Sequence, residues 1–265
     1  VRMYDTFMEE AEKNNWEVSF VDGNLDATTQ LNGIQDLVND DVDVMVISTW
    51  YIDAMEDVLQ QCVDKDIPVF VIGNTENPDT EHYDAGHLGG TYMSKYLKDQ
   101  GRDSIKMATM VGSTEQMKAR AQGFVDGMTD HGISVEVLNE YDVSTREEAM
   151  ASGEDALTTY PDIELFYGVS AQGALGAYDA TVGANRTEVM VFGYDGEDEE
   201  LEVIDEDNNY VGTVTQAPDV EASTTVEYIK KYLDGEEFDK IVPISAGIYC
   251  DEGQLTAEEV EESAK

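Results

Sequence analysis

The chain of 265 residues is long enough for one large domain or two medium ones. Its 58 acidic and 15 basic residues give a formal net charge of −43, which argues against nucleic acid or an anionic membrane surface as a partner, because both require a basic surface. A hydrophobic content of 41% argues against a disordered chain, and no apolar run approaches the ~18 residues that a membrane-spanning helix needs.

Short β-branched runs alternate with stretches of helical periodicity along the whole chain, which predicts repeated βα units. The expected strands cover residues 17–21, 43–48, 68–72, 105–111, 135–138, 164–167, 189–193 and 210–215. The expected helices cover residues 1–14, 27–38, 53–64, 88–100, 115–131, 146–159, 171–182 and 220–233. The expected strands are more than one compact sheet usually holds. The sequence therefore predicts an α/β protein with two doubly wound parallel-sheet lobes.

The acidic excess has two interpretations. In the first, the protein is adapted to a very salty medium, where molar salt shortens the Debye length to ~3 Å and removes the self-repulsion that opposes compaction. In the second, it is an acidic mesophilic protein that tolerates its charge. The small number of basic residues, spread thinly along the chain, favours the halophilic interpretation.

Motifs for catalysis and for cofactor or metal binding are missing from the sequence. We therefore expect no catalytic residue, no cofactor and no metal site. Ser170 lies in a GxSxxG stretch, whereas a nucleophile elbow has GxSxG spacing and needs a histidine base. The acidic residues 197–202 lack the ligand order of a calcium loop and are interpreted as a solvated helix face. Cys62 and Cys250 match no metal or redox spacing; we interpret them as buried apolar residues, and a disulfide between them stays open.

Polar and aromatic residues follow the carboxyl ends of the expected strands, which is where open α/β sheets bind ligands. They include Ser48, Trp50, Asn74, Ser170, Tyr194, Asp195 and Gln216. A hydroxyl group both donates and accepts hydrogen bonds, so carboxylates and amides can satisfy it, and an aromatic ring can cover the C–H face of a sugar. This set suits a neutral polyhydroxylated ligand.

Fragments spread in order over nearly the whole chain resemble one family. They are residues 22–31, 43–48, 67–72, 120–124 (Arg-Ala-Gln-Gly-Phe), 191–196 (Val-Phe-Gly-Tyr-Asp-Gly), 212–216 (Gly-Thr-Val-Thr-Gln) and 232–235. Together they resemble the ribose-type (type I) periplasmic sugar-binding proteins of ABC importers. The resemblance implies two lobes joined by a three-stranded hinge: residues 1–103 with 217–246, and residues 104–216 with 247–265.

The resemblance also places ligand contacts on Arg120, Tyr194, Asp195 and Gln216. Each has a plain structural alternative, because Arg120 can form an ion pair on a helix face, Asp195 can cap a helix and Gln216 can be an exposed hinge residue. Asn74 and Ser170 stand where the family has other polar or charged residues, which puts ribose itself in doubt. Trp50 supplies a stacking ring or packs its own loop.

The function implied by the resemblance is a non-enzymatic, monomeric solute-binding protein that closes on a sugar or polyol between its lobes and delivers it to a membrane permease. We expect an extracytoplasmic location, in the periplasm or at the cell surface. By the same comparison, the chain begins inside the first βα unit, so the first strand and any lipid anchor belong to a missing N-terminus. The alternative is the effector-binding domain of a lac-repressor-type regulator, which shares the fold; the C-terminal residues 241–250 and the negative charge favour the transport protein.

Overall fold

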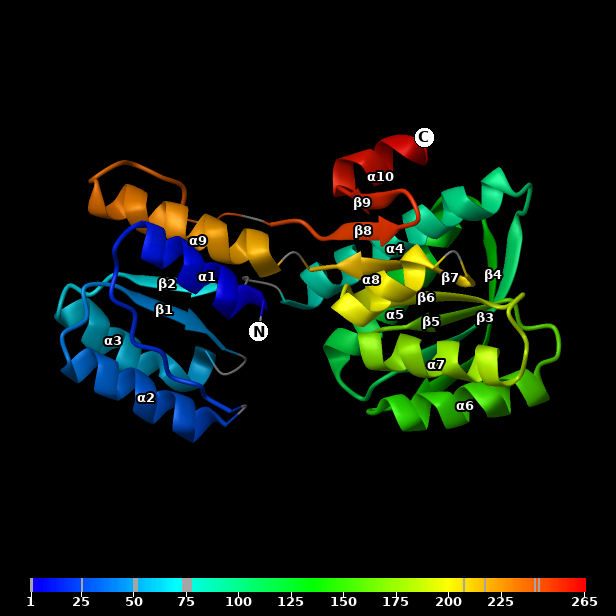
Figure 1. Cartoon of the computed structure of the whole chain (residues 1–265), viewed down its shortest axis with the longest axis horizontal. Helices are drawn as coiled ribbons and strands as arrows, with labels where there is room; N and C mark the ends of the chain where they lie inside the picture. Colours follow the sequence, from blue (N-terminus) through cyan, green and yellow to red (C-terminus); the bar gives the residue numbers. More distant parts are fainter. Residues whose placement is uncertain are drawn as a thin grey trace. The chain divides into compact units, whose positions relative to one another are not determined.

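The fold is described from a computed structural model, which describes residues 2–24, 26–49, 52–72, 78–206, 208–216, 218–240, 242 and 244–265. The chain forms two compact units (Figure 1). Unit 1 consists of Val1–Glu76 and Ala217–Ile244, and unit 2 of Asn77–Gln216 and Ser245–Lys265. The chain therefore passes between the units three times.

The described part of unit 1 contains two parallel strands, β1 (Met45–Ser48) and β2 (Val69–Ile72), paired from Met45 opposite Val69. Its helices are α1 (Arg2–Lys13), α2 (Ala27–Asn39), the 3-10 helix η1 (Ile52–Met55), α3 (Glu56–Asp64) and α9 (Pro218–Leu233). Helix α2 starts where the Asp26 carboxylate accepts a hydrogen bond from the amide of Thr29. Its apolar face packs with β1 and α3 in one small core that contains Ile34, Val38 and Cys62.

Residues 17–21, which the sequence predicts as a strand, pair with no other described strand. Phe20 of this segment is 61% exposed. A β-branched and aromatic run becomes a strand only where a neighbouring strand satisfies its backbone groups and covers its side chains. The strand propensity of residues 17–21 therefore does not lead to strand pairing among the described residues of unit 1.

Unit 2 contains a seven-stranded sheet in the order β4-β3-β5-β6-β7-β8-β9. Five strands run parallel, namely β3 (Ser104–Val111), β4 (Ser134–Asp142), β5 (Leu165–Gly168), β6 (Met190–Asp195) and β7 (Tyr210–Thr215), and β8 (Gly247–Cys250) and β9 (Gly253–Leu255) add antiparallel pairs. Its helices are α4 (Pro78–Asp99), α5 (Glu115–Asp130), α6 (Arg146–Thr159), α7 (Ala171–Gly183), α8 (Asp198–Asp205) and α10 (Ala257–Ser263). The predicted α/β fold with a mainly parallel sheet is confirmed.

Both faces of the sheet in unit 2 are covered. Side chains of α4, α5 and α10 pack on one face, and side chains of α6 and α7 pack on the other, where the two helices lie next to each other (Figure 1). Strand β5 is buried along its whole length: Phe166 faces one core, and Tyr167 faces the other, where it stacks on Phe124 with ring centroids 3.9 Å apart. This double burial explains the continuous apolar runs of the central strands.

Helix α4 belongs to unit 2. The sequence predicts the first boundary after residue 103, but the structure places it between Glu76 and Asn77, and the last crossing follows Ile244 rather than residue 246. The first boundary lies before α4 because α4 packs closely on α5 of unit 2. A Cβ atom on Gly90 would lie 2.1 Å from the carbonyl oxygen of Phe124, and one on Gly123 would lie 2.1 Å from that of Tyr83. Glycines thus let the two helix backbones touch.

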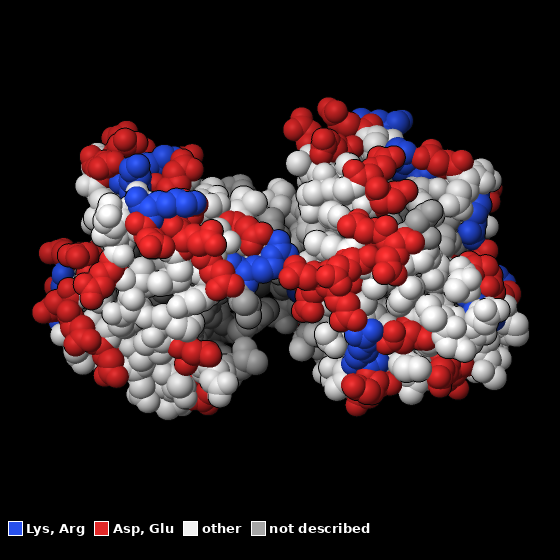
Figure 2. All heavy atoms as spheres, in the orientation of Figure 1, with Lys and Arg blue, Asp and Glu red and all other residues white. Residues whose placement is uncertain are grey.

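Acidic side chains form many groups on the face of each unit drawn in Figure 2, separated by areas of uncharged residues, and lysines and arginines form fewer and smaller groups. The predicted solvated acidic face at residues 197–202 is wrong at one position, because Glu200 is fully buried. Both cysteines are buried and neither forms a disulfide, Cys62 in unit 1 and Cys250 in unit 2. Within the described ranges, no helix is both long and apolar enough to cross a membrane.

Candidate functional site

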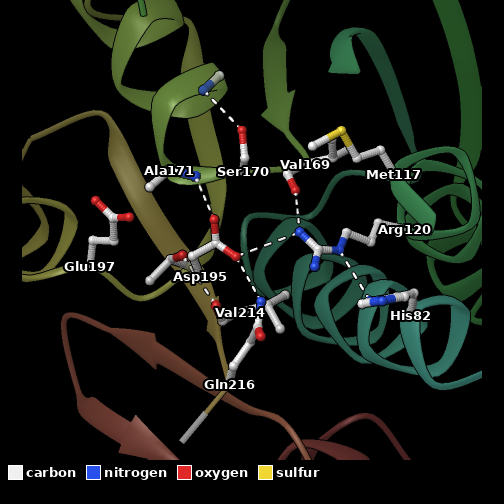
Figure 3. A network of polar contacts seen from close by, with 12 residues as sticks. His82, Met117, Arg120, Val169, Ser170, Ala171, Asp195, Glu197, Val214 and Gln216 are labelled. Carbon is white, nitrogen blue, oxygen red and sulfur yellow. Dashed lines mark hydrogen bonds and ion pairs between the residues drawn. The ribbon is translucent and has the colours of Figure 1, made fainter. Parts of the chain in front are cut away.

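The strands of unit 2 bring five of the predicted ligand residues together at one end of the sheet, and Figure 3 shows four of them, Arg120, Ser170, Asp195 and Gln216. Ser170 follows β5, Tyr194 and Asp195 end β6, and Gln216 follows β7. Arg120 reaches the same place from α5. The carboxyl ends of neighbouring parallel strands share one edge, which is why these positions meet although up to 96 residues separate them in the sequence.

Arg120 is a buried cation, 7% exposed, that is held on several sides. Its Nη1 donates to the carbonyl oxygen of Val169 at 2.9 Å, and its Nε donates to Nδ1 of His82 at 3.4 Å. The guanidinium carbon lies 3.8 Å above the ring centroid of Tyr194, a cation–π contact. A guanidinium fixed in this way cannot swing to solvent, so it presents a set direction to anything bound at the strand ends.

Asp195 compensates that charge. One carboxylate oxygen lies 3.5 Å from Nη1 of Arg120 and accepts a hydrogen bond from Nε2 of Gln216 at 2.7 Å. The other oxygen accepts from the amide of Ala171, at the start of α7, at 3.2 Å. Burial raises the pKa of Asp195, and the charge of Arg120 offsets part of that rise. The side chain keeps 28% of its surface exposed, so it is also open to a bound molecule.

The backbone of Asp195 has a φ of 108°, in the region that favours glycine, and Gly196 follows with a φ of 68°. A non-glycine residue in this conformation is strained and persists only where its surroundings hold it. The turn directs the Asp195 side chain back over the strand ends, toward Arg120 (Figure 3). The strain marks this turn as a functional candidate.

Ser170 and Tyr194 have local structural roles in the site. The hydroxyl oxygen of Ser170 caps α7 by accepting a hydrogen bond from the amide of Gly173 at 3.3 Å. Tyr194 is 2% exposed and lies beneath the Arg120 guanidinium, and its burial raises the pKa of the phenol to about 12. Tyr194 therefore supports Arg120 from below, and Ser170 fixes the helix that donates to Asp195.

The other three predicted ligand residues, Ser48, Trp50 and Asn74, belong to unit 1. Ser48 is exposed at the end of β1, and its carbonyl oxygen accepts from Nε2 of Gln30 at 2.8 Å. Thr49 donates to the Oε1 of Gln30 at 2.6 Å, so one glutamine holds both residues of this loop. Trp50 and Asn74 lie outside the described residues.

The sequence analysis did not single out His82. The residue lies on α4 and reaches Arg120 from 38 positions earlier in the chain. Because its Nδ1 accepts from Arg120, that nitrogen is unprotonated in this arrangement. The close packing of α4 on α5 creates the contact, and its only local signal in the sequence is the four-residue spacing of Gly86 with Gly90 and of Gly123 with Gly127.

Together these residues form a polar surface with balanced charge. One guanidinium and one carboxylate neutralise each other, and an exposed amide and a partly buried hydroxyl lie beside them. In the described ranges, no three histidine, cysteine, aspartate or glutamate side chains are grouped so that they could hold a metal ion.

Known proteins resemble this chain in sequence and in fold. A family model described as a periplasmic binding protein domain matches residues 1–237. The ribose import binding protein of Escherichia coli is 24% identical over 249 residues, which are 92% of this chain and 83% of that protein. A solute-binding protein of an ABC transporter from Bacillus halodurans, solved with bound myo-inositol, has a TM-score of 0.75 at 22% identity and covers 99% of this chain and 92% of its own. A periplasmic solute-binding protein of an ABC transporter from Actinobacillus succinogenes, solved with bound D-allose, has a TM-score of 0.75 at 16% identity. The match covers 94% of this chain and 92% of that protein.

Proposed function

The chain belongs to the periplasmic-binding-protein family, and on that premise we propose that it is the extracytoplasmic solute-binding protein of an ABC importer, binding a monosaccharide or related polyol. It acts by binding and carries out no reaction. The protein is a monomer, and its partner is a membrane permease, to which it delivers the solute. The observation that carries the proposal is the compensated pair of Arg120 and Asp195 at the strand ends of unit 2.

Charge balance selects the ligand class. An anionic ligand would compete with Asp195 for Arg120, and a cationic ligand would compete with Arg120 for Asp195. A hydroxyl group can donate to the carboxylate and accept from the guanidinium, so a neutral molecule with neighbouring hydroxyl groups uses both residues without leaving either charge uncompensated. The relatives that carry ribose, D-allose or myo-inositol in their names support this class.

We also propose that the two units close on the ligand. Gln216 supports this, because the chain passes from unit 2 to unit 1 directly after it, and its amide already binds Asp195. A ligand that contacts a residue at such a crossing shifts a hinge equilibrium by its differential contacts with the two states. Ser48, Trp50 and Asn74 are the residues that unit 1 would contribute.

A thermal-shift screen in molar KCl tests the function, with D-ribose, D-allose, myo-inositol and xylitol as neutral probes and ribose 5-phosphate as the charged control. A neutral probe at ~1,000 times its Kd should add ~4 kcal/mol to the free energy of unfolding, which raises Tm by several degrees. The phosphate should give a smaller shift than ribose. If no neutral probe shifts Tm, or if the phosphate exceeds ribose, the proposal is wrong.

A further inference from the structure

A buried carboxylate lies beneath the turn that carries Asp195. Glu200, on α8, has no exposed surface and accepts three hydrogen bonds. The phenol of Tyr210 donates to its Oε1 at 2.6 Å, and the hydroxyl of Thr213 donates to the same oxygen at 2.9 Å. The backbone amide of Glu197 donates to its Oε2 at 2.9 Å. All three donors are neutral, so these hydrogen bonds offset only part of the desolvation of the charged form.

The fold makes room for this carboxylate at Gly193. A Cβ atom there would lie 2.2 Å from Oε1 of Glu200 and 2.1 Å from the phenol oxygen of Tyr210. Gly193 pairs with Thr213 across the β6–β7 ladder, two positions before Asp195 pairs with Thr215. The cluster of Glu200, Tyr210 and Thr213 therefore lies directly behind the end of β6.

Hydrogen bonds hold the strained turn at Asp195 and Gly196 on both of its sides. On the side of the site, the Asp195 carboxylate binds the amide of Ala171 and the side chain of Gln216. On the other side, the next residue after Gly196 is Glu197, whose amide is bound by Glu200. The turn is therefore held at both of its ends, as a strained backbone requires.

We propose that Glu200 is a positioning residue of the binding site: by holding the Glu197 amide, it fixes the Asp195–Gly196 turn and keeps the Asp195 carboxylate directed toward Arg120 and the ligand. The part that concerns the ligand rests on the proposed function. The alternative is that Glu200 only caps α8. A glutamate three residues into a helix often binds the N-cap amide, but such a cap needs neither complete burial nor two hydroxyl donors from a neighbouring strand.

Two substitutions at Glu200 separate the hydrogen bond from the charge. In Glu200→Gln, the amide oxygen can still accept from Glu197, and its NH₂ group can donate to Tyr210 and Thr213, whose hydroxyls rotate to accept. Glu200→Ala removes the acceptor for the Glu197 amide. Glu202→Ala, an exposed position on the same helix, is the matched control.

The first readout is hydrogen–deuterium exchange at the amides of Gly196 and Glu197 in the protein without ligand. The second is the Kd for D-ribose, D-allose and myo-inositol by calorimetry. Glu200→Ala should exchange at least tenfold faster at these amides and bind the probes at least ~10-fold more weakly, the loss expected for one charge-assisted hydrogen bond. Glu200→Gln should stay within ~3-fold of the parent in both readouts, and Glu202→Ala should match the parent.

A lower Tm for Glu200→Ala with unchanged exchange and Kd would overturn the proposal, and so would equal losses in the Gln and Ala variants. If Glu200→Ala does not fold, Tyr210→Phe takes its place, because it removes one donor while keeping the ring. It should accelerate exchange at the turn, and parent-like exchange and Kd in this variant would overturn the proposal. If no probe binds the parent, the proposed function fails, and the exchange readout still decides whether Glu200 holds the turn.

Discussion

The two units of this chain differ in how completely their strands are buried. In unit 2, β5 lies between two cores and every one of its residues is buried, whereas β2 of unit 1 is mostly half-buried and Val71 is 41% exposed. Among the described residues, unit 1 has one small core around two strands, and unit 2 has a core on each face of a seven-stranded sheet. The difference teaches that a strand edge with strained backbone and buried charge forms where the surrounding packing can hold it.

The largest expected effect on stability comes from removing the ring of Phe124 in the core of unit 2. Phe124 is fully buried and stacked on Tyr167, so Phe124→Ala should lower the free energy of unfolding by ~3–5 kcal/mol. Phe70→Ala in unit 1 is the comparison, because that ring is only half-buried and should contribute ~1 kcal/mol. Chemical denaturation of both variants measures the difference. Equal losses, or a larger loss in unit 1, would contradict the contrast between the units.

A second substitution tests why α4 belongs to unit 2. Gly90→Ala puts a methyl group against the Phe124 carbonyl, which is backbone and cannot turn aside, so we expect a loss of ~3 kcal/mol. Gly183→Ala, at the end of α7, meets nothing within 4 Å and should be neutral or slightly stabilising. Urea midpoints compare the two. A neutral Gly90→Ala would show that the α4–α5 contact is looser than described.

The third prediction concerns the pH dependence of stability. Burial raises the pKa of Glu200 to about 7 from an ordinary value of 4.5, and the charge of Asp195 adds to the rise, while the hydrogen bonds from Tyr210 and Thr213 oppose it. The folded protein therefore binds this proton more tightly than the unfolded chain does. The stability from that proton is present below pH 4.5 and is lost as pH rises to 7, on the order of 3 kcal/mol in total.

The free energy of unfolding, measured from pH 4.5 to 8 for the parent, Glu200→Gln and Glu202→Gln, checks this sign. Relative to Glu200→Gln, the parent should lose stability as pH rises and level off above pH 7. Glu202→Gln should follow the parent, because that side chain is exposed. A parent curve that runs parallel to that of Glu200→Gln would show that the carboxyl of Glu200 titrates near its ordinary pKa.

The smallest expected effect comes from Ser170, which caps α7 and is also a proposed ligand residue. Ser170→Ala removes the cap of α7, and Thr145→Ala removes the equivalent cap of α6, where the Thr145 hydroxyl accepts from the amide of Glu148 at 3.2 Å. Both should lose ~1 kcal/mol of stability. Because we propose Ser170 as a ligand residue, only its variant should also weaken probe binding in calorimetry. Unchanged binding in Ser170→Ala would remove it from the site.

Most of unit 2 could be predicted from the sequence because its strands are apolar runs and its helices have clear caps and periodicity. The predicted positions at the strand ends of unit 2 meet because parallel strands share one edge, a rule that needs no three-dimensional information. The segment 17–21 shows the limit, since strand propensity has no effect without a pairing partner.

The two misses, His82 and Glu200, have different causes. His82 reaches Arg120 only because α4 packs on α5, and the four-residue spacing of Gly86 with Gly90 and of Gly123 with Gly127 was the available signal for that packing. Glu200 was hidden among acidic neighbours. Its spacing of four residues from the buried Ile204 places it on the inner face of α8, which could have indicated its burial.

The central claim is that Arg120 and Asp195 form a compensated pair that selects a neutral ligand. Calorimetry with Asp195→Asn tests it most directly, because the substitution keeps the shape of the side chain and leaves the guanidinium without its partner. The neutral sugar or polyol that stabilises the parent most should lose ~2 kcal/mol of binding free energy or more, and ribose 5-phosphate should bind the variant more tightly than the parent. Unchanged affinity for the neutral probe, with no gain for the phosphate, would contradict the account.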